Sequence, residues 1–102
     1  MKFLVIMKSK HVIPPEMLTG VYDGSIAWGR RYLASKKMEQ AWAFAGLPAG
    51  AGVLNVNSAE ELNQIMAECP LAGFAETQIY ALADFEKSLT QVKEVILAMV
   101  KK

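Results

Sequence analysis

The stretch AWAFAGLPAGAGVLNV, residues 41–56, decides which fold this chain can adopt. It has three glycines and one proline and lies inside an uncharged run from residue 40 to residue 59. A membrane span is excluded because Pro48, Asn55 and Asn57 interrupt the run. A phosphate-binding loop would lead from a strand into a helix with a lysine at its end, whereas here a second strand pattern follows and no lysine is near. The stretch therefore predicts two strands joined by a turn.

Patterns on both sides of this hairpin complete the order β-α-β-β-α-β-α. Five apolar residues in a row, from Phe3 to Met7, indicate a strand that is buried on both faces. Ser58 and Glu61 form a capping box at a helix start, and Pro70 ends that helix. The predicted strands cover residues 2–8, 38–45, 52–57 and 74–83, and the predicted helices cover residues 16–35, 58–69 and 84–100.

This order of elements is that of a ferredoxin-like α+β sandwich, βαββαβ, with an extra C-terminal helix. We expect a single domain over residues 1–102, with its core at residues 2–83 and the added helix at residues 84–100. The first and third strands are then central, the other two are edges, and helices cover one face of the sheet. The opposite face still carries apolar side chains, and the simplest way to bury them is to pair this face with that of a second copy of the chain. The sequence therefore predicts a homodimer that forms a dimeric α+β barrel.

Each predicted helix carries apolar residues at helical spacing, which indicates the side that faces the core. These stripes are Val21, Trp28 and Tyr32 in the first helix, and Leu62, Ile65, Met66 and Cys69 in the second. In the last helix, for which Asp84 is the predicted cap, the stripe expected to face inward is Phe85, Leu89, Val92, Ile96 and Met99. Leu97 and Val100 lie outside that stripe and indicate a second contact surface.

Glycines weaken the first predicted helix. Gly20, Gly24 and Gly29 each cost roughly 1 kcal/mol of helix stability relative to alanine. We expect close approach to a neighbouring backbone to compensate, and a kink near Gly24 is the alternative.

Charge and composition exclude several classes of protein. The 102 residues include 11 basic and 10 acidic side chains, so the chain lacks the excess positive charge of a nucleic-acid-binding protein. The single cysteine, Cys69, cannot form an internal disulfide, as is typical of a reducing compartment, and its place on an apolar stripe predicts a buried thiol. The N-terminal apolar run is too short for a signal peptide. We therefore expect a cytoplasmic protein without nucleic-acid or membrane partners.

Three sequence elements in a fixed order carry a resemblance to a known family. They are a strand end with Trp42, Ala45 and Gly46, a strand and helix cap with Val53, Val56, Ser58, Glu61 and Leu62, and a helix stop with Pro70 and Leu71. In this order and spacing, over residues 2–82, the chain resembles the muconolactone delta-isomerase family.

The resemblance implies a ferredoxin-like subunit that pairs into a barrel, assembles into a ring such as a decamer, and belongs to aromatic catabolism. The implied reaction is a cofactor-free proton shift in an unsaturated lactone, which needs a base and a donor that stabilises the enolate. The sequence departs from the family at polar positions. The family has a histidine two residues before the tryptophan and a basic residue after it, where this chain has Gln40 and Ala43. Polar and aromatic family residues after the turn correspond here to residues 50–52, Gly-Ala-Gly.

Two side chains are candidate catalytic bases. A carboxylate in an apolar pocket has a raised pKa and can abstract a proton, and Glu39 is the first candidate, with a solvent-exposed place at a sheet edge as its alternative. His11, the only histidine, cannot build a metal site alone and is either the base or a surface-loop residue. The predicted substrate-binding residues are Trp42, Gln40, Tyr22, Trp28 and Glu76.

The sequence leaves three functions open. We predict a cofactor-free and metal-free isomerase that moves a proton in a small lactone or aromatic-derived compound. The alternative is a non-catalytic protein that binds a small apolar ligand or serves as an oligomeric scaffold on the same fold. The third candidate is a cofactor-free monooxygenase-like barrel of the antibiotic-biosynthesis type. A cavity that a carboxylate or imidazole enters would favour an enzyme, and a filled interior or a cavity without a titratable group would favour binding or a scaffold.

Overall fold

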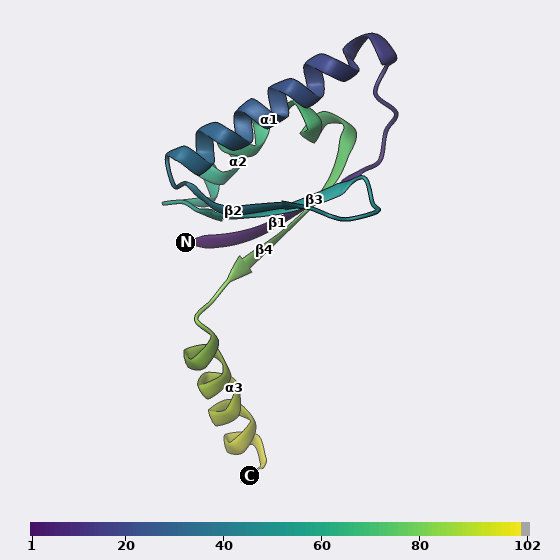
Figure 1. Cartoon of the computed structure of the whole chain (residues 1–102). Coiled ribbons are helices and arrows are strands. Elements are labelled where there is room, and N and C mark those ends of the chain that lie inside the picture. Colours follow the sequence, from purple (N-terminus) through teal and green to yellow (C-terminus); the bar gives the residue numbers. More distant parts are fainter. Residues whose placement is uncertain (101–102) are drawn as a thin grey trace.

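The computed structural model describes residues 1–100 as a layered α+β body followed by a projecting helix (Figure 1). The strands are β1 (Lys2–Ser9), β2 (Met38–Ala43), β3 (Ala49–Asn55) and β4 (Ala75–Leu82). The α-helices are α1 (Leu18–Ala34), α2 (Ala59–Ala67) and α3 (Phe85–Val100), and short 3-10 helices are η1 (Pro15–Met17) and η2 (Pro70–Phe74). The predicted α+β class and element order are confirmed.

The four strands form one antiparallel sheet in the order β2-β3-β1-β4. Strands β1 and β3 are central and β2 and β4 are edges, as predicted, because Phe3 on β1 lies between Leu54 on β3 and Ala81 on β4. Strand β3 begins at Ala49 rather than at the predicted Gly52, since its ladder with β1 extends to Ala49.

The core lies between the sheet and the helices α1 and α2, which cover the same face (Figure 1). At the centre of this core, Leu54 is only 1% exposed. The other buried members are Phe3, Val5, Met38, Val56, Leu62, Ile65 and Met66, with Trp28 and Tyr32 partly buried against them. Val21 and Cys69 are buried as well, so the predicted stripes of the first two helices are confirmed.

Side-chain hydrogen bonds fix the start of α2. Ser58 Oγ accepts the backbone N–H of Glu61 at 3.1 Å, as the capping box predicts. The Glu61 carboxylate accepts a hydrogen bond from the N–H of Asn57 at 3.0 Å and forms an ion pair with Lys37 at 3.0 Å. The Asn57 hydrogen bond, with Lys37, lowers the pKa of Glu61. Glu61 therefore adds stability above its ordinary pKa, and this contribution is lost as the pH falls through the lowered value.

Helix α1 is joined to α2 near its C-terminal end. Trp28 Nε1 donates to the carbonyl oxygen of Ile65 at 2.8 Å. Arg31 donates to the Glu68 carboxylate at 2.7 Å, and the Tyr32 hydroxyl donates to the same oxygen. The Glu68 hydrogen bond raises the pKa of Tyr32. These contacts hold one half of α1 against the body.

The glycines of α1 differ in their surroundings. A Cβ at Gly24 would lie 3.1 Å from Pro70 Cγ, so this glycine does permit a close approach to η2. At Gly20 and Gly29 a Cβ would have no neighbouring atom within 4 Å. The expected approach to a neighbouring backbone is therefore wrong at Gly20 and Gly29, and at Gly24 the close neighbour is the side-chain ring of Pro70 rather than a backbone.

Helix α3 leads away from the sheet on the side opposite to α1 and α2 (Figure 1). It starts as predicted, with the Asp84 carboxylate accepting the N–H of Lys87 at 2.9 Å. Its apolar stripe does not face inward, because all sixteen residues lie outside the core and Phe85 is 80% exposed. That prediction is wrong, since periodicity identifies an apolar side but not the surface that covers it. None of the helices within residues 1–100 is long and apolar enough to cross a membrane.

Candidate functional site

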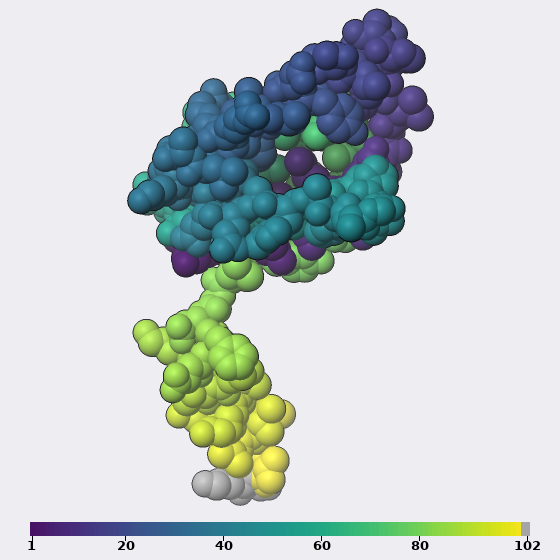
Figure 2. Space-filling model, viewed as in Figure 1, coloured from purple at the N-terminus to yellow at the C-terminus, as the bar shows by residue number. Residues whose placement is uncertain are grey.

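A hollow separates α1 from the sheet and the β2–β3 hairpin (Figure 2). Its first lobe has a volume of about 330 Å³ and its second lobe about 190 Å³. Residues that line the first lobe include Met7, Ser9, Ile13, Tyr22, Leu71 and Phe74. Residues that line the second include Val5, Ser25, Trp28, Gly29, Met38 and Met66.

Small residues on the hairpin side leave this space unfilled. Ala43 and Ala49 border the first lobe, Gly52 borders the second, and Gly50 borders both. A Cβ at Gly50 would lie 2.8 Å from the carbonyl oxygen of Trp42, closer than real Cβ contacts come. Glycine at this position therefore lets β2 and β3 pair at the wall of the hollow.

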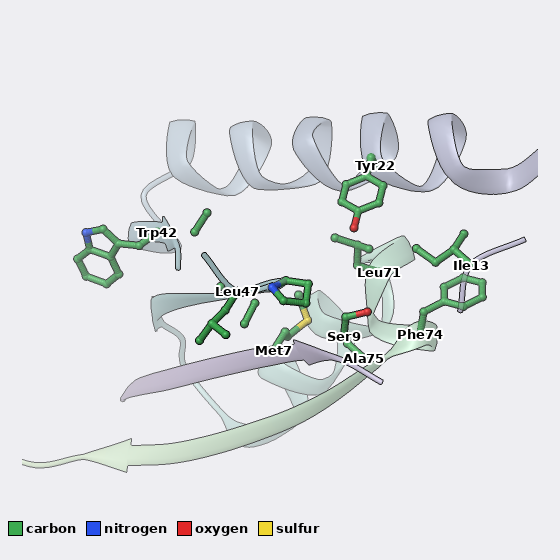
Figure 3. A pocket seen from close by; sticks show the side chains of 13 residues that line it. Met7, Ser9, Ile13, Tyr22, Trp42, Leu47, Leu71, Phe74 and Ala75 are labelled. Carbon is green, nitrogen blue, oxygen red and sulfur yellow. The ribbon is translucent and has the colours of Figure 1, made fainter. Parts of the chain in front are cut away.

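The lining of the first lobe is apolar apart from two hydroxyl groups. Ser9 ends strand β1, and Tyr22 lies on α1 opposite the sheet. Figure 3 shows the Tyr22 hydroxyl oxygen directed from α1 toward Leu71. Within residues 1–100 no carboxylate or imidazole lines either lobe. The hollow can therefore hold an apolar molecule and offer it hydroxyl hydrogen bonds.

Three of the seven predicted site residues border the hollow. Tyr22 lines the first lobe, Trp28 lines the second and Trp42 borders both. The indole of Trp28 is committed to its hydrogen bond with Ile65. The indole ring of Trp42, a residue that is 51% exposed, points away from the other labelled side chains (Figure 3).

Three other predicted residues lie on the edge strands, outside the hollow. Glu39 pairs with Lys2 at 3.2 Å and accepts from Asn55 Nδ2 at 3.3 Å, at the end of β2 remote from the hairpin turn. Gln40 lies opposite Val53 on β3 and Glu76 lies opposite Lys8 on β1, and both are exposed. Their roles in binding or catalysis stay predictions.

The seventh predicted residue, His11, lies in the loop beside the first lobe. Its backbone N–H donates to the carbonyl oxygen of Phe74 at 3.0 Å, and the same loop contributes Ile13 to the lining. The His11 side chain is exposed and is not part of the lining. Its catalytic role also stays a prediction.

Sequence reasoning missed most of the lining. The apolar run at the N-terminus places Met7 in a buried strand. The sequence gives no signal of a site at Ser9, Ile13, Leu71 or Phe74, because these residues are mostly apolar and come from separate parts of the chain. They form the wall of a cavity only because the fold brings them together. Among the residues the structure describes, no cluster of three or more acidic, histidine or cysteine side chains could hold a metal ion.

The fold and the hollow define the class of protein: a ferredoxin-like α+β protein with an apolar cavity between α1 and the sheet. The chain belongs to the muconolactone delta-isomerase family, whose family model matches residues 1–88. No curated protein matches the chain.

Two solved structures share the fold. The crystal structure of a muconolactone isomerase superposes with a TM-score of 0.76 at 23% identity, over 82% of this chain and 90% of that one. The 5-chloro-2-hydroxyhydroquinone dehydrochlorinase of Burkholderia phenoliruptrix, solved in complex with 2,5-dihydroxybenzoquinone, gives a TM-score of 0.58 at 19% identity. That match covers 85% of this chain and 98% of the dehydrochlorinase. At these identities both likenesses show the fold alone.

The close approach at Gly50 predicts a strong effect of a single methyl group. Gly50→Ala forces β2 away from β3 and costs about 1–3 kcal/mol of unfolding free energy. Gly73→Ala is the matched control, because a Cβ there meets no atom within 4 Å. Urea unfolding of both variants measures the difference, and equal midpoints would contradict the role assigned to Gly50.

Proposed function

We propose that the chain binds a compact ring compound with a carbonyl or hydroxyl group, such as a lactone or a quinone, in the first lobe of the hollow. The observation that carries this proposal is an apolar cavity of about 330 Å³ with the Ser9 and Tyr22 hydroxyls among its lining residues. Such a cavity lies within the size range of ligand sites, in which apolar walls supply affinity and a few polar groups fix orientation.

The comparisons support this class of ligand. The family is named for an isomerase of a lactone, and the dehydrochlorinase of similar fold holds a dihydroxybenzoquinone. Both compounds are small oxygen-bearing rings. A neutral ring also suits a lining without charged side chains, because an ionised ligand would lose its hydration there without a partner of opposite charge.

The Tyr22 hydroxyl provides the first test. Tyr22→Phe removes a hydrogen bond to the carbonyl oxygen of the ligand, so the dissociation constant for γ-valerolactone should rise about 2- to 12-fold. Tyr80→Phe is the matched control, since Tyr80 lies on β4 outside the hollow. A ligand-observed NMR titration measures both constants. Equal binding by the two variants would remove Tyr22 from the site, and no binding by the parent chain would overturn the proposal.

A second candidate function, favoured by membership of the family, is a cofactor-free proton shift in the bound ring. Among residues 1–100 no carboxylate or imidazole lines the hollow, so the base would come from a segment beside it. The backbone of His11 is hydrogen-bonded to Phe74, its loop contributes Ile13 to the first lobe, and an imidazole is a common general base. The Tyr22 hydroxyl would then stabilise the enolate oxygen.

Incubation with a neutral unsaturated lactone, α-angelica lactone, in D₂O tests this second function. NMR should show the double bond at its new position and deuterium at the carbon that gains the proton, and His11→Gln should slow this isomerisation about 10²- to 10⁴-fold. His11→Gln leaves the backbone hydrogen bond to Phe74 in place, so the loop keeps its anchor. A comparable loss in Glu39→Gln instead would assign the base to Glu39, and no isomerisation by the parent chain would leave binding as the function.

We further propose that the chain functions as an oligomer of identical subunits. The sheet face opposite α1 carries Leu4, Ile6 and Val53, and α3 exposes a continuous apolar side. Both surfaces belong to the same chain and neither is covered within residues 1–100. The charged residues of α3 balance, since Glu86 and Glu94 match Lys87 and Lys93, so two copies do not repel each other. A second copy is therefore the cover that these surfaces fit best.

Light scattering tests the oligomer. The chain has a mass of 11.2 kDa, and the parent protein should scatter as at least twice that mass at micromolar concentration. Ile96→Lys, on the apolar side of α3, should lower the mass toward that of the single chain, because a charge in the contact is costly. Glu94→Lys on the polar side is the control and should leave the mass unchanged. A parent protein that scatters as a single chain would contradict the proposal.

A further inference from the structure

The two lobes of the hollow form one elongated space. Met7, Trp42 and Gly50 line both lobes, so the lobes adjoin at these residues. Along β1 the lining extends from Ser9 in the first lobe to Val5 in the second, a distance of about 13 Å at the rise of a strand. A single compact ring in the first lobe therefore leaves the second lobe, of about 190 Å³, unoccupied.

The second lobe offers a ligand almost only apolar contacts. Two of its polar side chains are already engaged: Trp28 Nε1 donates to Ile65, and Ser25 Oγ donates to Val21 and accepts from Leu71. The third, Trp42, borders both lobes, and its indole ring points away from the other labelled lining residues (Figure 3). The remaining wall is built from Val5, Met38, Leu54, Met66 and the small residues of the hairpin. Such a lobe favours hydrocarbon over any group that needs a hydrogen bond.

Gly29 keeps the second lobe open on the α1 side. It lies seven residues after Tyr22, which puts both residues on the same flank of the helix, above the two lobes. A Cβ at Gly29 would meet no atom within 4 Å, so no packing requirement explains the glycine. The residue costs helix stability and leaves space in the lobe.

We propose that the second lobe is a subsite for an apolar substituent, so that the ligand is a ring compound with an alkyl or aryl chain. A lobe of about 190 Å³ has room for roughly six groups the size of a water molecule or methylene. A chain of that length would extend from a ring in the first lobe past Met7 and under Gly29. This inference rests on the proposed ring site in the first lobe and adds the class of compound that fills the whole hollow.

A pair of lactones that differ only in chain length tests the subsite. γ-Valerolactone carries a methyl group and γ-nonalactone carries a pentyl group on the same ring. Four added methylenes that become buried should tighten binding to the parent chain on the order of 100-fold. Gly29→Leu fills the second lobe and should reduce this gain to less than about tenfold, while binding of γ-valerolactone stays within about twofold of the parent value.

Gly20→Leu is the matched control. Gly20 is also in α1 with no atom within 4 Å of a Cβ, but it lines neither lobe, so the full gain from the longer chain should remain. Circular dichroism melting confirms that each variant is folded. If γ-valerolactone binds and γ-nonalactone binds no tighter, or if both leucine variants behave alike, the subsite is refuted and the ring site stands. If neither lactone binds the parent chain, the ring site itself fails.

Discussion

The position of α1 above the core depends first on one hydrogen bond. Trp28 Nε1 donates to the carbonyl oxygen of Ile65, which joins α1 to α2 directly above the core. A helix of seventeen residues extends about 25 Å and behaves as a rod on this scale. Its C-terminal half is fixed to α2 by Trp28, Arg31 and Tyr32, and its N-terminal half is fixed to η2, where Ser25 Oγ accepts the N–H of Leu71. The helix held in this way faces the hairpin end of the sheet, where the residues are small. The hollow is a consequence of that attachment.

The sequence predicts the layers of the fold because each depends on local chemistry. The Ser58 cap, the apolar stripe of α2 and the buried run of β1 each identify an element and the side that it buries. The boundary of β3 was misplaced because alanine and glycine at residues 49–52 give no strand signal, and pairing with β1 rather than propensity decides that they extend. The sequence identifies which side of α3 is apolar but not which surface covers that side, because the covering surface is not a property of the helix alone.

The candidate site is harder to predict, for a physical reason. Sequence reasoning searches for acids, bases and ligands of metals, and it selected Glu39 and His11 on that ground. A hollow is defined by side chains that are missing, and Gly29 and Gly50 have no chemistry that marks them as part of a site. Tyr22 was found because it is aromatic and polar at once, whereas Ser9 was not. The lining formed by residues 1–100 carries no charged side chain, which is why sequence reasoning does not recognise it as a site. This absence of charge also favours binding over proton transfer within a single chain, because proton transfer needs a group that titrates near the reacting carbon.

Strand β1 separates the hollow from the uncovered face of the sheet. Neighbouring residues of a strand point to opposite faces, so Val5 and Met7 line the hollow while Leu4 and Ile6 lie on the uncovered face of the sheet. A second copy on that face and a ligand in the hollow therefore do not compete for the same side chains. Because both depend on β1, pairing of two copies would stiffen the floor of the hollow without filling it.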